Sequence, residues 1–379
     1  MSVNIDDDEL KRYARQLRLP DMSIVAQTRL KKARVLIVGA GGLGNPVAIS
    51  LAAAGTGNIG IVDDDTVEIS NLHRQTAFTD NDIGRSKSQA LCEYIRKVNP
   101  YVNATPYDEK LTILNARRLF SQYEIIIDAC DNFETRYLIN DTCVLLKKPN
   151  VSAAIFNHEG QLSNYVLNGG PCLRCLFPEP PPAELAPNCA EAGVLNTLSN
   201  TFGALQANEA IKLITASQKP LNGELVHFNL SNFEFNKLSF ARDPHCKICN
   251  QNQSIRQKVS LYLSLHQIDQ DDQSPAHVWT YQTLRNKFAN DEPFTVVDIR
   301  EENELGDVEF QADYHIPYSE LSLSNRSFKK IKTPVVFCCL FGKNSLFAAM
   351  KMNTLDSQKY YSLKGGILNL TEKDRWDKI

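Results

Sequence analysis

Short apolar runs alternate with stretches of helical composition over the first 250 residues. Residues 35–38 form a β-branched run that enters a glycine cluster, and residues 58–62 form a second run that ends in three aspartates. A third run, at 125–128, also ends in a polar group. Because stretches such as residues 86–98 separate these runs, the pattern predicts βαβ units and a mostly parallel sheet.

Two changes of composition divide the chain. Five prolines follow Phe177 within eleven residues, which predicts a crossover loop because proline lacks an N–H and fixes φ. Residues 251–275 are polar and rich in glutamine, and a second α/β pattern follows, with strands expected at 294–298 and 335–338. We therefore expect two domains, at 1–250 and 276–379, and a linker at 251–275.

The overall composition limits the classes of function. Of the 379 residues 43% are hydrophobic and 22% charged, which excludes wholesale disorder, and a net charge of −3 gives no general attraction to nucleic acid or to an anionic membrane. Residues 35–62 carry no charged side chain, but their seven glycines favour strand, turn and helix over a membrane span. The acidic N-terminus lacks the apolar core of a signal peptide, so we expect a soluble, cytoplasmic protein.

A glycine-rich loop is the first candidate binding site. Residues 39–44 fit G-x-G-x-x-G between an expected strand and an expected helix, where backbone N–H groups bind phosphates. Asp63 follows Gly44 by 19 residues, the usual place for a carboxylate that accepts from ribose hydroxyls. The loop alone is compatible with a dinucleotide or with ATP. Two later cations, Arg74 and Lys87, suit a triphosphate, and Asp131 at the end of a later strand could hold Mg²⁺.

The ordered set of motifs resembles one family closely. The segments RYARQ (12–16), GAGGLG (39–44) and SNLHRQ (70–75), followed by Lys87 and by Asp131-Asn132, are similar to the molybdopterin-synthase and thiamine-biosynthesis adenylyltransferases, relatives of the ubiquitin-activating enzymes. The resemblance covers residues 9–250. It implies an α/β fold, a Rossmann-like ATP-binding domain, and a homodimer in which Arg15 reaches the phosphates of the neighbouring subunit.

The resemblance also implies roles for individual residues. Gly42 would contact the nucleotide, Asp63 the ribose, and Asp131 a magnesium ion, with Arg74 and Asp131 as catalytic residues. The full nucleotide-binding set it implies is Arg15, Gly42, Asp63, Ser70, Asn71, Leu72, His73, Arg74, Lys87, Asp131 and Asn132. Taken singly, each has a plainer interpretation: the arginines and Lys87 as solvated charges, Asp131 as a helix cap, and His73 as a surface histidine.

Ten cysteines without an export signal favour metal or sulfur chemistry over disulfides. Cys172 and Cys175 form one C-x-x-C pair, and Cys246 and Cys249 form another. Four thiolates from two such turns suit tetrahedral Zn²⁺ with no open position, which is a structural site. A redox role for a single pair is the alternative.

Two further cysteines are candidates for reactive sulfur. Cys189 follows the proline-rich segment and aligns with a cysteine that, in some members of the resembling family, attacks the adenylated partner; the alternative is a bystander. Cys339 ends an expected strand, and a loop wrapped around it would direct backbone N–H groups at its sulfur. Cys338 should point to the other face of the strand, into the core.

The segment around Cys339 resembles the rhodanese sulfurtransferase loop, C-x-x-G-x-x-S. Residues 297–301, 315–317 and 363–367 agree with that family, so the resemblance spans residues 276–379 and implies a small α/β rhodanese-like domain. Asn344 stands where the family often has arginine, with Lys343 beside it as a possible substitute. The alternative is an inactive rhodanese-like module that serves only for docking.

Together the two resemblances imply one enzyme. It would contain a structural Zn²⁺ and would use ATP and Mg²⁺ to adenylate the C-terminal glycine of a ubiquitin-like sulfur-carrier protein that ends in Gly-Gly. A Cys339 persulfide, formed from a donor such as thiosulfate or a cysteine desulfurase, would then yield a C-terminal thiocarboxylate. Rival hypotheses are an NAD-dependent oxidoreductase, a non-catalytic scaffold with the same fold, and an adenylyltransferase that acts on a peptide or another carrier.

Overall fold

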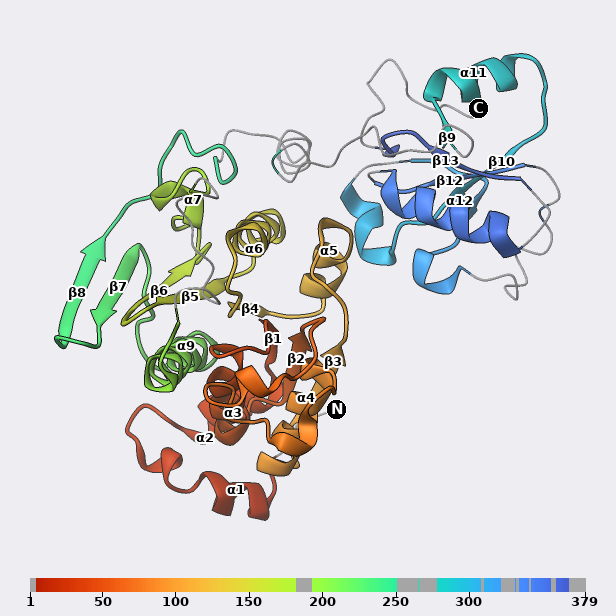
Figure 1. Ribbon diagram of the computed structural model, residues 1–379. Coiled ribbons are helices and arrows are strands. Elements are labelled where there is room, and N and C mark those ends of the chain that lie inside the picture. Colours follow the sequence, from red (N-terminus) through yellow and green to blue (C-terminus); the bar gives the residue numbers. More distant parts are fainter. Residues whose placement is uncertain are drawn as a thin grey trace. The chain divides into compact units, whose positions relative to one another are not determined.

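The chain forms two compact units, Met1–Asn252 and Gln253–Ile379, each with its own sheet (Figure 1). The computed structural model describes residues 5–181, 193–250, 265, 278–307, 310–321, 331, 334–340, 342–355 and 359–367. The predicted linker at 251–275 lies outside these residues apart from Leu265, and so does Cys189.

The helices and strands of the first unit alternate through most of its length. Its α-helices are α1 (Asp7–Tyr13), α2 (Ile24–Lys32), α3 (Gly44–Ala54), α4 (Lys87–Val98), α5 (Ile113–Ser121), α6 (Phe133–Leu146), α7 (Leu173–Leu176) and α9 (Asn196–Thr215). Its strands are β1 (Arg34–Val38), β2 (Asn58–Val62), β3 (Asn103–Tyr107), β4 (Ile125–Asp128), β5 (Asn150–Phe156), β6 (Glu159–Tyr165), β7 (Glu224–Asn229) and β8 (Glu234–Ser239). Short 3₁₀ turns are η1 (Gln16–Arg18), η2 (Ile69–Asn71) and η3 (Asp80–Asp82).

The first unit has an eight-stranded sheet in the order β3-β2-β1-β4-β5-β6-β7-β8. The first five strands in this order, β3-β2-β1-β4-β5, pair in parallel, as the alternating pattern predicts. Strands β6, β7 and β8 continue the sheet in antiparallel pairing. Only two residues separate β5 from β6, and Asn157 has a φ of 52°, so this connection can form only a hairpin. The sequence analysis did not anticipate this antiparallel extension.

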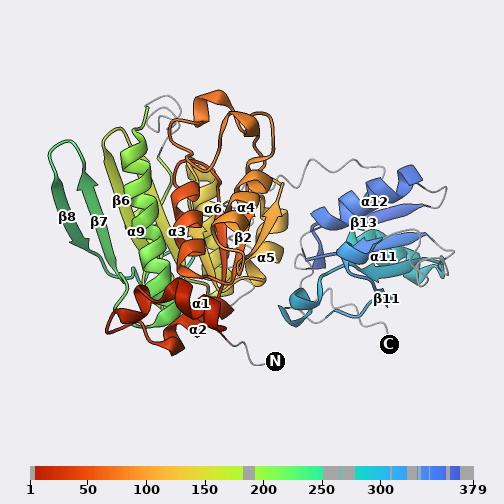
Figure 2. The same cartoon turned by 90° about the horizontal axis from the view of Figure 1, so that it is seen from below.

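Helices cover both faces of the parallel half of the sheet. Helices α3, α4 and α9 lie on one face, and α5 and α6 lie on the other (Figures 1 and 2). The core on the first face joins side chains of β1, β2, α3 and α9, among them Ile37, Ile59, Leu51 and Phe202, which are fully or almost fully buried. Helices on both faces leave the ends of the parallel strands as the place where polar side chains gather. Among the described helices, none combines the length and apolarity that crossing a bilayer requires.

Two glycines allow the tight turn between β1 and α3. Gly39 has a φ of +99°, and a Cβ there would lie 2.7 Å from the carbonyl oxygen of Ala129. A Cβ on Gly44, the first residue of α3, would lie only 1.9 Å from the carbonyl oxygen of Gly39. Because both approaches involve backbone atoms, no side chain can move away to relieve them. The turn therefore places the N-terminus of α3 directly above the end of β1.

The second unit is a smaller α/β domain. Its elements are β9 (Val278–Trp279), α11 (Tyr281–Ala289), β10 (Thr295–Asp298), η6 (Glu302–Asp307), β11 (Tyr314–His315), η7 (Tyr318–Glu320), β12 (Val335–Cys338), α12 (Lys343–Leu355) and β13 (Tyr360–Leu363). The sheet has the order β11-β10-β12-β13-β9, and every pair is parallel. Phe337 and Cys339 join one apolar cluster, whereas Val336 and Cys338 join another. The prediction that Cys338 is a core residue facing away from Cys339 is confirmed.

The turn between β1 and α3 yields a stability prediction. We expect Gly44→Ala to lower the free energy of unfolding of the first unit by at least about 2 kcal/mol, because the new methyl group overlaps a backbone oxygen. Gly41→Ala is the matched control, since a Cβ there would meet its nearest neighbour at 3.9 Å and its φ is not positive. Urea denaturation monitored by circular dichroism measures both variants. Equal stability of the two variants would contradict this account of the turn.

Candidate functional site

The carboxylate of Asp63 connects the ends of the neighbouring strands β1 and β2. Its Oδ2 accepts from the backbone N–H of Ala40 at 2.7 Å, and its Oδ1 accepts from the N–H of Asp65 at 2.9 Å. Burial raises the pKa of Asp63 above that of an ordinary aspartate, although these two hydrogen bonds and the charge of Lys87 act in the opposite direction. Asp63 is thereby fixed at the edge of the glycine loop, with the carboxylate facing the loop backbone.

The segment from Ser70 to Arg74 folds back on itself beside the loop. The guanidinium of Arg74 donates to the carbonyl oxygen of Ser70 at 2.9 Å, and Nδ1 of His73 lies 3.0 Å from the same oxygen. The Cδ of Arg74 lies 3.7 Å from the position that a Cβ on Gly42 would take. Arg74 is therefore next to the glycine loop. Leu72 instead packs against the apolar core.

Asn71 supports the same segment from inside. Its side chain is buried, and its Oδ1 accepts from the backbone N–H of Glu68 at 3.1 Å. Its Nδ2 donates to Oγ of the exposed Ser70 at 3.4 Å. Asn71 thus stabilises the 3₁₀ turn η2, whereas Ser70 presents its hydroxyl at the surface.

Lys87 is a buried cation at the N-terminus of α4. Its Nζ lies 2.8 Å from Oδ2 of Asp65, a carboxylate that is largely exposed. A backbone bridge between Thr66 and Ser86 holds the two segments together. Because burying an ammonium group is unfavourable without a counter-charge, the contact with Asp65 stabilises Lys87 at this position.

Asp131 and Asn132 have different local roles. Asn132 is the N-cap of α6, and its Oδ1 accepts from the N–H of Thr135 at 2.8 Å. Asp131 is exposed, and Asn132 donates to its Oδ1 at 3.4 Å. The cap of α6 is therefore Asn132, so the plainer interpretation of Asp131 as the cap is wrong. The loop that carries Asp131 lies next to Gly39 through Ala129.

The structure brings Gly42, Asp63, Arg74 and Lys87 to the carboxyl edge of the parallel strands, with the Asp131 loop beside them. Arg15 is exposed at the start of η1, and no contact described within the chain joins it to this edge. Its assignment to a neighbouring subunit stays a prediction. Cys189 belongs to residues 182–192, which the structure does not describe.

Two buried polar residues near this edge were not identified from the sequence. Asn45 donates to the carbonyl oxygen of Ala40 at 2.7 Å and accepts from the N–H of Ala77 at 2.8 Å, so it fastens the glycine loop to the segment after Arg74. Asp128 is fully buried and accepts from the hydroxyl of Ser152 at 2.6 Å. In the sequence each of these two residues is a polar residue in or at the end of an apolar stretch. That pattern does not identify the hydrogen-bond partners that the structure shows.

The four cysteines of the two C-x-x-C pairs form one cluster. The Sγ atoms of Cys172 and Cys246 lie 3.6 Å apart, those of Cys175 and Cys249 lie 3.4 Å apart, and all four lie within 4.8 Å of one another. A tetrahedral zinc ion with Zn–S bonds of 2.3 Å requires sulfur atoms about 3.8 Å apart. The donor set therefore fits Zn²⁺.

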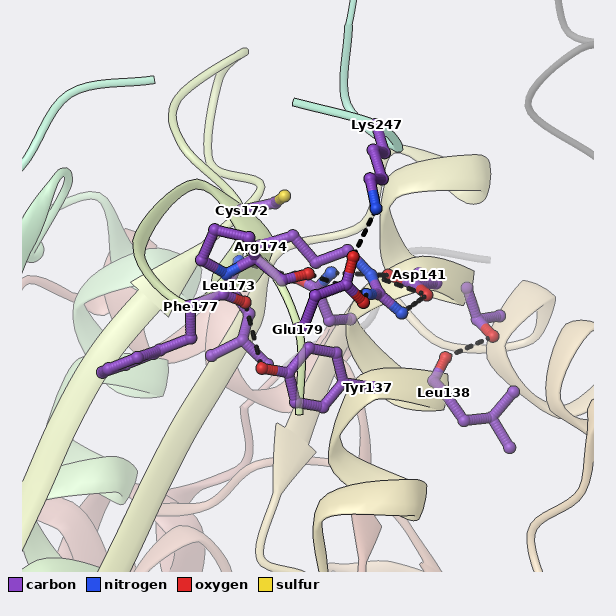
Figure 3. A network of polar contacts seen from close by, with 12 residues as sticks. Tyr137, Leu138, Asp141, Cys172, Leu173, Arg174, Phe177, Glu179 and Lys247 are labelled. Atoms are coloured by element: carbon purple, nitrogen blue, oxygen red, sulfur yellow. Dashed lines mark hydrogen bonds and ion pairs between the residues drawn. The ribbon is translucent and has the colours of Figure 1, made fainter. Parts of the chain in front are cut away.

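A buried ion pair anchors the first cysteine turn to α6 (Figure 3). The guanidinium of Arg174, inside the first C-x-x-C pair, lies 2.8 Å from Oδ2 of Asp141, and both side chains are almost completely buried. The same guanidinium lies over the ring of Tyr137, 4.6 Å from its centroid. On the exposed side Glu179 contacts Arg174 at 3.8 Å and also contacts Lys247 of the second pair. The network connects α6, both cysteine turns and the start of the proline-rich segment.

In the second unit, a loop surrounds Cys339. Its buried Sγ accepts from the backbone N–H of Gly342 at 3.1 Å and from that of Ser345 at 3.3 Å. Gly342 has a φ of +85°, and a Cβ there would lie 2.8 Å from the backbone nitrogens of Gly365 and Gly366. The turn after β13 thus closes on the loop. N–H groups directed at a sulfur stabilise its anion, so Cys339 has the surroundings of a nucleophilic thiolate.

Comparisons with known proteins agree with these observations. Residues 13–248 match the model of the ThiF family. The adenylyltransferase and sulfurtransferase MOCS3 of Aedes aegypti is 36% identical over 364 residues, which cover 93% of this chain and 83% of that protein. The sulfur carrier protein adenylyltransferase of Thermus thermophilus is 44% identical over 257 residues, 66% of this chain and 95% of that protein. Among solved structures, E. coli MccB with MccA-N7isoASN shares the fold, with a TM-score of 0.57 and 23% identity over 65% of this chain and 76% of that chain.

The buried ion pair yields a second stability prediction. We expect Asp141→Asn to lower the free energy of unfolding by about 3 kcal/mol, because it leaves the buried guanidinium of Arg174 without its main counter-charge. Lys247→Ala, which removes an exposed partner at the other end of the network, should cost less than about 1 kcal/mol. Chemical denaturation measures both. If the two variants are equally stable, the buried pair does not have this role.

Proposed function

The chain belongs to the ThiF family of adenylyltransferases, and on that premise we propose that it activates the C-terminal glycine of a ubiquitin-like sulfur-carrier protein with ATP. The observation that carries the proposal is the edge formed by the glycine loop, Asp63, Arg74 and Lys87. Two cations beside a glycine loop at a helix N-terminus suit a triphosphate, which carries more charge than the pyrophosphate of a dinucleotide. This arrangement favours ATP over NAD.

In the proposed reaction, the carrier's terminal carboxylate attacks the α-phosphorus of ATP. The bond between that phosphorus and the bridging oxygen of pyrophosphate breaks, which gives an acyl-adenylate and pyrophosphate. Arg74 and Lys87 would offset the negative charge that builds up on the phosphates, an effect commonly worth a few kcal/mol per contact. Asp131 would hold a magnesium ion, which supplies further charge neutralisation when bound.

Lys87 is held ready for this role by Asp65. Their contact of 2.8 Å keeps the ammonium group at the edge of the loop before any phosphate arrives. Because Asp65 is largely exposed, water can solvate its carboxylate when Lys87 turns towards a phosphate. The pair therefore positions the cation at little cost to nucleotide binding.

We further propose that the second unit supplies sulfur through Cys339. The thiolate would attack the outer sulfur of thiosulfate, or of a desulfurase persulfide, and release sulfite or the donor thiolate. The persulfide anion would then attack the acyl carbon of the adenylate and expel AMP. A second thiolate, for which we propose Cys189, would attack the Cys339 sulfur of the acyl disulfide, releasing the carrier as a thiocarboxylate and leaving a disulfide between the two cysteines.

The remaining components of the proposal concern assembly. We propose a homodimer in which Arg15 reaches the phosphates of the partner subunit, a cytoplasmic location, and a domain boundary near residue 250. We also propose one structural Zn²⁺ per chain at Cys172, Cys175, Cys246 and Cys249, supported by the sulfur–sulfur distances. Metal analysis of the purified chain tests the stoichiometry. The Aedes aegypti relative, which is named for both adenylyl and sulfur transfer, matches 93% of the chain, which supports placing both activities here.

Pyrophosphate exchange tests the first half of the reaction. With a carrier protein present, the chain should exchange labelled pyrophosphate into ATP, and Asp131→Ala should slow the exchange at least about a hundredfold because a magnesium ligand is lost. Glu134→Ala is the matched control, since it removes an exposed carboxylate three residues away on α6. Exchange that persists in Asp131→Ala would remove the magnesium assignment. Carrier binding without any exchange would favour a non-catalytic scaffold.

Sulfur transfer from thiosulfate to cyanide tests the second half. Cys339→Ser should reduce the rate roughly a thousandfold or more, because a hydroxyl is not ionised at neutral pH and cannot form a persulfide. Cys338→Ala, which alters the opposite face of the same strand, should keep most of the rate. Thiocyanate measured as its iron complex reports the product. A wild-type chain without transfer activity would favour a docking role for the second unit.

A further inference from the structure

We propose that Ser362 is a positioning residue that releases the hydroxyl of Ser345 to donate to the sulfur anion of Cys339. Ser362 lies on β13, outside the cysteine loop, and its side chain is fully buried. The inference rests on the proposed nucleophilic role of Cys339. It adds a residue from a separate strand, which neither the loop motif nor the comparisons assign.

Two described N–H donors and one hydroxyl, which accepts from the thiol, surround the sulfur. The backbone N–H groups of Gly342 and Ser345 lie 3.1 and 3.3 Å from Sγ of Cys339, and Oγ of Ser345 lies at 3.3 Å. The two N–H groups are fixed by the backbone. The hydroxyl of Ser345 can rotate, so it accepts from a neutral thiol and can donate to a thiolate or persulfide only if its proton is not engaged elsewhere.

The carbonyl oxygen of Gly342 competes for that proton. It accepts from the N–H of Leu346 at 3.1 Å, and the hydroxyls of Ser345 and Ser362 each lie 3.0 Å from it. A carbonyl oxygen has two lone pairs, and the helical N–H occupies one of them. Only one of the two hydroxyls can therefore bond well to this oxygen at a time.

Ser362 resolves the competition in favour of the sulfur. The Oγ atoms of Ser345 and Ser362 lie 2.8 Å apart, so both hydroxyls belong to one network. When Ser362 donates to the carbonyl oxygen of Gly342, that oxygen no longer competes for the proton of Ser345. The acceptors that remain are the neutral Oγ of Ser362 and the sulfur anion, and a hydrogen bond to an anion is the stronger of the two. Without the Ser362 hydroxyl, the carbonyl would draw the Ser345 proton away, and the sulfur anion would lose one donor.

The described charged groups near the loop pair with other groups or are exposed. Asp298 and Arg300, from the end of β10, pair with each other at 2.7 Å, and His315 contacts the carbonyl oxygen of Arg300. Glu320 after β11 and Lys364 after β13 are exposed. Asn344 stands where the resembling family often has arginine, so the neutral donors to the sulfur gain weight.

The test measures the pKa of the Cys339 thiol in the full chain. Alkylation by iodoacetamide is followed against pH, and the Cys339 peptide is quantified by mass spectrometry. We expect Ser362→Ala to raise this pKa by about one unit, the scale of one hydrogen bond to an anion. Ser345→Ala should raise it at least as much. Because Ser362 acts only through Ser345, the double variant should match Ser345→Ala.

The controls separate this mechanism from loss of structure. Ser163→Ala removes an equally buried hydroxyl, bonded to the carbonyl oxygen of Glu224 at 2.9 Å, and should leave the Cys339 pKa unchanged. Thermal unfolding shows whether each variant is folded. An unchanged pKa in a folded Ser362→Ala variant, or a shift that adds to that of Ser345→Ala, would overturn the proposal. The assay needs no sulfur donor, so the shift can appear even if sulfur transfer fails, and transfer can succeed without the shift.

Discussion

The hydrogen bond from the N–H of Ala40 to the carboxylate of Asp63 is the contact on which the proposed nucleotide site depends. It joins the end of β1 to the end of β2, and it forms only because the loop turns tightly enough to aim that N–H at the neighbouring strand. This tight turn requires glycine at positions 39 and 44, because a Cβ atom at either position would overlap a backbone oxygen. Arg74, Lys87 and the Asp131 loop lie beside this turn, at the carboxyl edge of the parallel strands.

A second constraint acts at α6, where buried charges meet the four-cysteine cluster. The pair between Arg174 and Asp141 fixes the first cysteine turn on α6, and Glu179 extends the network to the second turn. The four sulfur atoms lie at distances suited to zinc, and the proposed ion would crosslink segments far apart in the sequence. The proline-rich segment begins at this anchored position, close to where the proposed resolving thiol follows in the chain.

Both units place their chemistry by the same device. In each, a parallel strand ends, glycines allow a sharp turn, and a helix begins with its N–H groups directed at the candidate site. At Gly42 these groups suit phosphate, and at Gly342 they surround the sulfur of Cys339. In the second loop the hydroxyls of Ser345 and Ser362, 2.8 Å apart, add a side-chain network to the backbone donors.

The sequence by itself determined the strands β1, β2, β4, β10 and β12, the family, and the order of its motifs, because these depend on local hydrophobic pattern and residue spacing. It also identified the four cysteines as a set, since C-x-x-C spacing is itself a ligand geometry. Only the tertiary structure decided which neighbour each polar group meets. It made Asn132 the cap of α6, gave Lys87 the partner Asp65, and added the antiparallel strands β6 to β8. It also brought Ser362 to Ser345 from 17 residues away. Such contacts depend on the register and packing of distant segments, which local composition does not encode.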